Sequence, residues 1–446
     1  MSGGSAWTGA AVAAVTVGYA LFSRRLSTTP VSAPMVFTGF GVLIGPVGLD
    51  VLDLGRDAGP VLTLIEAALA LLLFTDAMTV RGRDLRTDGF LPLRLLVIGL
   101  PLSIAAGWLL AVPLFPGLTM WEFALLGAVL APTDAALGKT AGSSPRVPVL
   151  VRHGLNVESG LNDGLVLPFF LLFLAAVPGT LASEEGADGV FWRALIVSTA
   201  VGLVLGWAGG RLLVLARARD WATGEWQQVV VLAVAFCAYG VATGVDGSGF
   251  IATWTGGFAF GAALRKGRPA KGRPAKGRPD GERPAEERPA DLAEYVGGLL
   301  GTLSFLVFGA VLLGPVLEHL NWRTLTYAVL SLTVVRMLPV ALALIGTGMR
   351  LPTLAYIGWF GPRGLASVTL GLLLVEDHVP GTAVLGPVIA VTIGLSILLH
   401  GMSAPYFANL YGNWYDAVEA DTPGLREARG TADASPRHHA GTRRLR

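Results

Sequence analysis

Long apolar segments constrain this chain more than any other feature of its sequence. About thirteen segments are long enough to cross roughly 30 Å of hydrocarbon as helices. In order, they cover residues 7–23, 31–49, 59–79, 90–115, 119–138, 147–177, 190–215, 226–244, 247–264, 293–318, 322–347, 352–375 and 382–404. Hydrophobic residues make up 53% of the chain and charged residues 14%, unlike a soluble domain of this length. The sequence therefore predicts an all-α polytopic membrane protein.

Charged residues between the spans test this assignment independently. Cytoplasmic loops of membrane proteins carry an excess of Lys and Arg. Basic residues fall in every second loop, and acidic residues dominate the loops between, with Arg56 and Arg323 as the main exceptions. The basic positions are Arg24, Arg25, Arg81, Arg83, Arg86, Lys139, Arg146, Arg211, Arg350, the 265–290 segment and the tail. We therefore expect a multi-pass protein of the cell membrane, with the N-terminus outside and the C-terminus in the cytoplasm.

Two segments lie outside the predicted transmembrane domain. Residues 265–290 repeat a five-residue unit rich in Lys, Arg and Pro. Because Pro at every fifth position forbids a helix and nothing apolar is available to bury, this segment is predicted to be a disordered cytoplasmic loop. Residues 405–446 are predicted to form a largely disordered cytoplasmic tail. The transmembrane domain would then occupy residues 1–404. The single cysteine, Cys237, excludes an intramolecular disulfide, and its apolar surroundings predict a buried thiol.

Two of the predicted spans are interrupted at corresponding places. The fifth contains Ala131-Pro132-Thr133-Asp134, and the twelfth contains Phe360-Gly361-Pro362-Arg363-Gly364. Each is the fifth span of a six-span unit, at residues 7–177 and 226–404. Paired breaks of this kind point to a transporter built from two inverted repeats, with its site between the breaks near the membrane midplane.

Charged side chains within the spans are the candidate functional groups. Each costs about 2.5–3.5 kcal/mol in the middle of a helix, so they must face one another or water. Six residues are of this kind: Glu66, Asp134, Glu158, Asp163, Arg336 and Arg363. Four acids against two arginines leave two carboxylates without a cationic partner, and these two are candidates for exchange of a proton or cation.

The stretch 157–164 carries the densest polar group. At helical pitch, Glu158 and Asn162 share one face, and Ser159 and Asp163 share the next. Asp163 is the preferred exchanger, because a carboxylate in a dehydrated cavity can hold a proton and release it to a cation. The alternative is that it caps a neighbouring helix. We expect Glu158 to pair with Arg336 as a structural ion pair.

The broken fifth span supplies further candidates. Freed carbonyls at the break can ligate a hard cation, so Thr133 is expected to contribute its backbone oxygen. Asp134 is expected to act through water, or else to stabilise the break. Arg363, at the matching break, would offset helix dipoles or neighbour Asp134.

Three other residues complete this set of predictions. Ser159 is either a hydroxyl ligand or bonded within its own helix. Weaker candidates are Glu66 and Asp76, both in the third span.

Three motifs in order, Ala131-Pro132-Thr133-Asp134, Glu158-Ser159-Gly160-Leu161-Asn162-Asp163 and Trp359-Phe360-Gly361-Pro362-Arg363-Gly364, carry a family resemblance. The chain resembles the cation/proton antiporter superfamily, in particular the electroneutral branch with bacterial NhaP-type and animal plasma-membrane exchangers. The resemblance implies crossed, broken fifth and twelfth helices, a homodimer, and movement of a core domain against a dimerisation domain.

The resemblance also assigns roles to residues. It implies a Na⁺ site at Asp163, Ser159 and Thr133, with Asp134 completing the broken-helix pair, and it matches Glu158 and Arg336 to the structural ion pair. The electrogenic branch carries a second aspartate where this chain has Asn162. Exchange of one proton for one cation is therefore expected.

Other functions are weighed against exchange of Na⁺, or Li⁺ or K⁺, for H⁺. Within the transporter class, the alternative is a K⁺-preferring K⁺/H⁺ antiporter. Polar broken helices also line channels, so a cation channel is a further alternative. The sequence shows no nucleophile elbow, phosphate loop or zinc-protease motif, which disfavours an enzyme. We expect no cofactor and no nucleic-acid partner.

Overall fold

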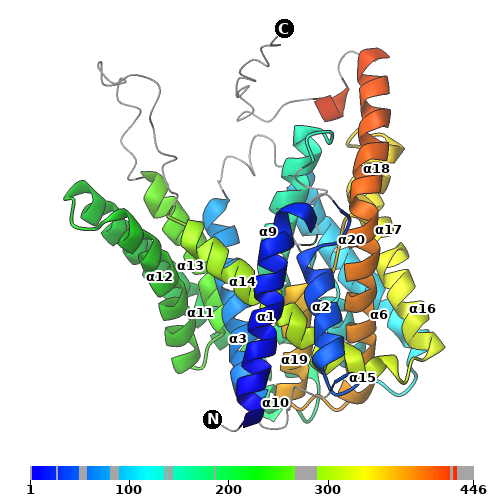
Figure 1. The fold of residues 1–446 in the computed structure, drawn as a ribbon, viewed down its shortest axis with the longest axis horizontal. Coiled ribbons are helices and arrows are strands. Elements are labelled where there is room, and N and C mark those ends of the chain that lie inside the picture. The colour runs from blue at the N-terminus through cyan, green and yellow to red at the C-terminus, as the bar shows by residue number, and fades with distance from the viewer. Residues whose placement is uncertain are drawn as a thin grey trace.

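The computed structural model of the chain describes residues 3–26, 29–49, 58–80, 90–134, 137, 144–184, 187–266, 289–421 and 425–428. All its regular elements in these ranges are helices (Figure 1). The first half contains α1 (Gly3–Leu26), α2 (Ala33–Ile44), α3 (Ala58–Thr79), α5 (Phe90–Arg94), the π-helical turn η1 (Leu95–Gly99), α6 (Leu100–Leu114), α7 (Met120–Val129), α9 (Val149–Ala176), α10 (Leu181–Glu184) and α11 (Ala187–Ala218).

The second half begins with α12 (Gly224–Gly244) and α13 (Gly249–Lys266). It continues with α14 (Asp291–Phe308), the π-helical turn η2 (Gly309–Leu313), α15 (Gly314–Leu317), α16 (Trp322–Leu332), α17 (Val334–Ala343), α18 (Leu351–Trp359), α19 (Leu365–Glu376), α20 (Thr382–Asp421) and the short 3₁₀ turn η3 (Arg426–Ala428). Every predicted span overlaps one of these helices or two to three consecutive helical pieces.

The all-helical membrane architecture is thus confirmed. Eight helical stretches of the described ranges are long and apolar enough to cross a membrane, and α2, α7 and α19 are shorter apolar helices. The shortness of α7 and α19 follows from the breaks that the sequence indicates. The count of thirteen spans stays a prediction.

The helices pack in two groups. One group contains α2, α3, α11, α12, α13 and α14, and the other contains α5, α6, α7, α9 and α16 to α20. In the first group, α11 and α13 cross so closely that a methyl group at Gly206 would overlap the carbonyl oxygen of Gly256. Helix α9 lies between the groups, because it packs on α3, α11 and α13 as well as on α5 and α7.

The two ends of the helical part lie on opposite faces of the molecule. In Figure 1, α1 begins at the lower face, and α20 rises past the upper face. An odd number of crossings would place them in this way.

The structure corrects the predicted boundary of the tail. Residues 405–421, predicted to be disordered, continue α20. Ala404, Ala408, Tyr411 and Tyr415 recur at intervals of three and four residues and are buried, so this part of the helix has an apolar face that packs on the protein. Charged residues elsewhere on the helix made the segment look like a tail.

A short segment after α20 is also ordered. Glu427 is buried, and its Oε1 accepts hydrogen bonds from the backbone N–H of Arg350 at 3.0 Å and from the Thr353 hydroxyl at 2.9 Å. The Arg426 guanidinium lies 4.7 Å from the centre of the Phe90 ring. Residues 425–428 are therefore anchored to α18 and α5, and residues 429–446 of the predicted tail lie outside the described residues.

Two smaller expectations also need correction. Arg265 and Lys266, assigned to the disordered loop, belong to the last turn of α13, and residues 289–290 form a turn before α14. The repeat between them, 267–288, lies outside the described residues. Cys237 is exposed on α12 rather than buried, because an apolar surface in a membrane protein can face lipid.

Candidate functional site

The fifth span breaks as the sequence predicts. Helix α7 begins with a capping box, in which Glu122 N–H donates to the Thr119 hydroxyl and Thr119 N–H donates to Glu122 Oε2. It ends at Val129, and residues 131–134 are not helical. Pro132 has no N–H to continue the helix, so carbonyls of the last turn are left without helical partners.

The twelfth span breaks in the same manner. Helix α18 ends at Trp359 and α19 begins at Leu365, with Gly361 and Pro362 between them. The two broken spans meet at these interruptions. Asp134 N–H donates to the Pro362 carbonyl at 2.7 Å, and Ser367 Oγ donates to the Val129 carbonyl at 2.6 Å. The predicted crossing of two broken helices is confirmed.

Asp134 holds the crossing together. Its Oδ2 accepts from the N–H of Leu365 at 2.9 Å, and its Oδ1 accepts from the N–H of Leu137 at 3.2 Å. The first of these N–H groups starts α19, so the carboxylate caps that helix from the other break. A methyl group at Gly364 would overlap this carboxylate, so glycine is needed there. These contacts favour the stabilising role of Asp134 that the sequence left open.

Arg363 compensates the opposite helix end. Its side chain is fully buried, and Nη1 donates to the carbonyls of Ala131 at 2.6 Å and Pro132 at 3.1 Å. These carbonyls follow the C-terminal end of α7, where the helix dipole is negative. These contacts favour the first of the two roles that the sequence left open for Arg363, compensation of the helix dipole.

The polar face of α9 meets the fifth-span break. Thr133 Oγ1 lies 3.1 Å from Ser159 Oγ and accepts a hydrogen bond of 2.5 Å from Asn162 Nδ2. All three side chains are buried. Three of the predicted site residues are thus brought together, and Asn162 orients the threonine hydroxyl.

Asp163 lies one residue further along α9. Its Oδ1 is buried and has no hydrogen-bond partner in the described part of the chain. Asp134 and Asp76 are close enough to interact with it electrostatically. Asp76, on α3, packs against α9, since a methyl group at Gly160 would lie 3.4 Å from its Cβ. Asp134 and Asp76 thus lie on either side of the α9 segment that carries Asp163, and of Asp134 and Asp163 only Asp134 has both carboxylate oxygens engaged by backbone N–H groups.

Glu158 and Arg336 form an ion pair inside the second helical group. Arg336 Nη1 and Nη2 donate to the two carboxylate oxygens at 2.6 and 2.8 Å, and both side chains are buried. The charge count of the spans predicts this pair. Because both of its carboxylate oxygens bind Arg336, Glu158 is not a candidate ion ligand, although it is next to Ser159 in sequence.

Glu66 is not part of this cluster. It interacts electrostatically with Tyr239 of α12 and with Glu376, the last residue of α19. Ten residues of α3 separate it from Asp76, a rise of about 15 Å. Its role at the site is therefore not supported.

Sequence reasoning missed several polar residues that link different parts of the chain by hydrogen bonds. Glu122 also binds the N–H of Gly381 at 2.6 Å, and Arg94 binds the carbonyl of Ile345 at 2.6 Å. Ser396, His400 and Ser403 of α20 bond to the ends of the twelfth-span break. Their spacing in an otherwise apolar span is a signal that could have found them, because it places them on one helical face.

The donor set is suited to an alkali cation. Two hydroxyls and a carboxylate supply oxygen ligands, which hard cations prefer. Within the described ranges, no three His, Cys, Asp or Glu side chains are grouped so as to hold a metal ion between them.

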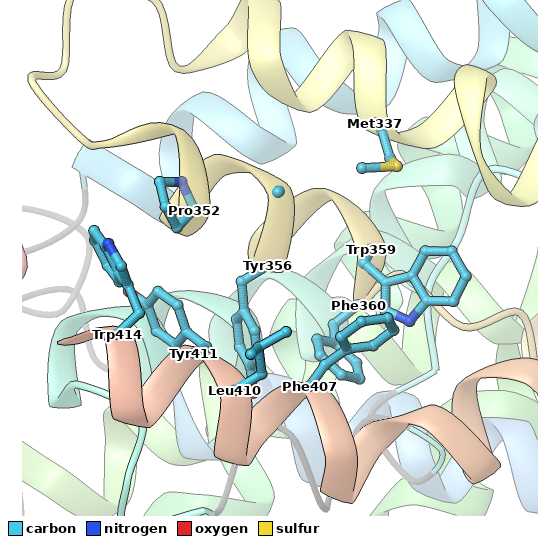
Figure 2. Close-up of a pocket in the computed structure, with 10 residues that line it drawn as sticks. Met337, Pro352, Tyr356, Trp359, Phe360, Phe407, Leu410, Tyr411 and Trp414 are labelled. Atoms are coloured by element: carbon cyan, nitrogen blue, oxygen red, sulfur yellow. The ribbon is translucent and has the colours of Figure 1, made fainter. Parts of the chain in front are cut away.

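A separate cavity lies behind the twelfth-span break. Its volume is about 450 Å³, and it is bounded by α17, α18 and α20 (Figure 2). Six of the residues around it are aromatic: Tyr356, Trp359, Phe360, Phe407, Tyr411 and Trp414. It contains no carboxylate, so it is not the site of the candidate ion ligands.

Crossed broken helices around buried carboxylates define a membrane transporter. Residues 11–409 match the sequence model of the family described as sodium/hydrogen exchanger, transmembrane. The chain belongs to this family.

Individual relatives agree with this assignment. The chain is 26% identical over 391 residues to the K(+)/H(+) antiporter NhaP of Alkalimonas amylolytica, covering 85% of this chain and 62% of that one. It is 24% identical over 413 residues to the Na(+)/H(+) antiporter of Schizosaccharomyces pombe, covering 81% of each. It thus spans less than two thirds of the first relative.

A solved structure shares the fold. The sodium proton antiporter MjNhaP1 from Methanocaldococcus jannaschii at pH 8 superimposes with a TM-score of 0.73 at 20% sequence identity. The match covers 92% of this chain and 98% of that one. The similarity extends through most of the helical part.

Proposed function

We propose that this protein exchanges a monovalent alkali cation for H⁺ across the membrane, with Asp163 binding either the proton or the cation. The observation that supports this most is the buried Oδ1 of Asp163, which has no hydrogen-bond partner among the described residues. Asp163 lies one helical turn along α9 from Ser159, whose hydroxyl is 3.1 Å from that of Thr133. A buried carboxylate oxygen without a partner is costly, and either a proton or a cation would compensate it.

The other buried acids support this choice by elimination. Glu158 binds both arms of the Arg336 guanidinium, and both oxygens of Asp134 accept backbone N–H bonds. Protonating either would break contacts that hold the fold. Asp163 can change its occupant without such a loss, so competition between proton and cation at this residue couples their movements.

The stoichiometry follows from the same residues. Asn162 carries no charge and donates to Thr133, so the polar face of α9 contributes one exchangeable carboxylate. One proton is then exchanged for one cation, and transport is electroneutral. Asp76 is a nearby carboxylate on the other helical group, and in this proposal it assists cation binding without changing its own charge.

Alternating access would come from movement between the two helical groups. The site lies on α9 where this helix faces α3 and α13, so a shift of α9 with its group would carry Asp163 toward one surface and then the other. We propose that in the cell membrane the upper face of Figure 1 faces the cytoplasm, because α1 and α13 end there with the basic pairs Arg24-Arg25 and Arg265-Lys266. We also propose that the protein is a homodimer, as the family resemblance implies.

Na⁺ is the proposed cation, and K⁺ is the second candidate because the relative from Alkalimonas amylolytica is named a K(+)/H(+) antiporter. The test is proton movement in proteoliposomes on addition of Na⁺, K⁺ or Li⁺ over a pH series. A response to Na⁺ that saturates supports the proposal, and a larger response to K⁺ favours the second candidate. Conductive, uncoupled cation flux would instead indicate a channel.

A further inference from the structure

Three polar residues on one face of α20 form hydrogen bonds with the residues on either side of the twelfth-span break. Ser396 Oγ accepts from the backbone N–H of Arg363 at 2.7 Å. His400 Nε2 lies 2.9 Å from the carbonyl oxygen of Trp359. Ser403 Oγ accepts from the Trp359 indole N–H at 2.9 Å. Since Trp359 ends α18 and Arg363 comes just before α19, these bonds bridge the break from one side to the other.

Both ring nitrogens of His400 have hydrogen-bond partners. Nε2 lies 2.9 Å from the Trp359 carbonyl oxygen, and Nδ1 lies 3.0 Å from the Ser396 carbonyl oxygen and 3.1 Å from the Ser396 hydroxyl. A carbonyl oxygen only accepts and a neutral imidazole carries one N–H, so the tautomer decides which carbonyl receives the hydrogen. In the Nε2–H tautomer, the Ser396 hydroxyl donates to Nδ1 and still accepts from the N–H of Arg363. In that tautomer a chain of bonds runs from Arg363 through Ser396 and His400 to Trp359.

The bridged segment has little support of its own. Pro362 has no N–H, and its neighbours are outside the helical ladder. Yet this segment presents the Pro362 carbonyl to Asp134, and the next helix presents the Leu365 N–H to the same residue. His400 and Ser396 are themselves almost fully buried, so their bonds do not compete with water. The break is thus bonded on one side to residues of α20 and on the other side to Asp134 of the fifth span.

We propose that His400 is a positioning residue which, through Ser396 and Trp359, keeps the twelfth-span break rigid and thereby sets the affinity and selectivity of the cation site. This inference rests on the proposed cation exchange. Selectivity among hard cations depends on how rigidly the ligands are held. A loosened break would let Asp134 and, with it, neighbouring Thr133 adjust to cations of different size.

The Trp359 ring adds a second contact to His400. The two ring centres are 5.3 Å apart, and Figure 2 shows the indole beside the aromatic cavity. Loss of this packing alone would destabilise the protein without a specific effect on cations. The experiment therefore needs variants that separate packing from hydrogen bonding.

Three variants of the whole chain serve this purpose. His400→Leu fills the space but removes both bonds. His400→Gln keeps a donor for the Trp359 carbonyl. Ser396→Ala removes the hydroxyl that binds the Arg363 N–H and His400 Nδ1 but leaves the bond from His400 to Trp359. Because it is a small change, it keeps the test possible if His400→Leu does not fold. Each is compared with the parent by amide hydrogen exchange over residues 359–365 in detergent, and by transport of Na⁺, K⁺ and Li⁺ in proteoliposomes.

The expected result is faster exchange at Gly361, Arg363 and Leu365 in His400→Leu and Ser396→Ala. Their KM for the preferred cation should rise about five- to tenfold, the range of one or two lost hydrogen bonds, with kcat within about twofold. The KM ratios among the three cations should converge, and His400→Gln should recover most of the parent values.

Unchanged hydrogen exchange with unchanged KM ratios would overturn the inference. So would a fall in kcat that only follows the amount of folded protein. If the parent showed no cation-dependent proton movement, the proposed exchange would fail, and hydrogen exchange would still decide whether His400 holds the break.

Discussion

The guanidinium of Arg336 binds both carboxylate oxygens of Glu158, at 2.6 and 2.8 Å, across 178 positions of sequence. Removing one partner would leave the other charge buried and unpaired. We expect Glu158→Gln and Arg336→Met each to lower the free energy of unfolding by about 3–5 kcal/mol. The measurement is the unfolding midpoint of the purified protein in detergent.

The double variant is the control for that prediction. With both charges removed, Glu158→Leu with Arg336→Met should be closer to the parent than either single variant. Additive losses in the double variant would mean that the two side chains act independently.

Gly364 tests the fit between the two breaks. A methyl group there would meet the Asp134 carboxylate, so Gly364→Ala should disrupt the crossing and reduce the yield of folded protein. Gly386→Ala on α20 is the matched control, because a methyl group at that position would have nothing within 4 Å. Size-exclusion profiles of the two variants compare them directly. Equal behaviour of both would contradict the packing described for Gly364.

Asp134→Asn separates support of the break from cation binding. The amide can accept through one oxygen only, so one of the two backbone N–H groups loses its acceptor. We expect a loss of about 1–3 kcal/mol in unfolding free energy. A variant as stable as the parent but with a weakened cation affinity would show instead that Asp134 acts chiefly as a ligand.

Asn162→Asp addresses the stoichiometry. The new carboxylate would lose the donated bond to Thr133 and stand beside Asp163. If the site still transports, a second proton can be carried for each cation, and the rate should depend on membrane potential. Transport is measured at potentials set by a K⁺ gradient with valinomycin. A rate that does not respond to potential in an active variant would count against the stoichiometric role of this position.

The sequence predicts the broken spans well because local chemistry determines them. Pro132 and the Gly361-Pro362 pair interrupt a helix wherever it lies in the fold. The cost of buried charge likewise predicts the pairing of Glu158 with Arg336, since few partners are available in a membrane. These predictions need no knowledge of the three-dimensional arrangement.

Other features depend on tertiary contacts that a linear pattern does not contain. Glu66 and Asp76 look alike in sequence, but only Asp76 faces α9. Asp134 looked like a possible ligand until the N–H of Leu365 was found at its Oδ2. The end of α20 was missed because Tyr411 and Tyr415 are buried by neighbours far away in sequence. His400 was missed because its partner Trp359 lies on another helix.

The central claim is that Asp163 carries the proton or the cation in turn. The most direct measurement is cation-dependent proton movement in proteoliposomes containing the parent or Asp163→Asn at equal amounts of folded protein. We predict saturable exchange by the parent and none above background by the variant, which cannot ionise. Exchange by Asp163→Asn at the rate of the parent would contradict the account.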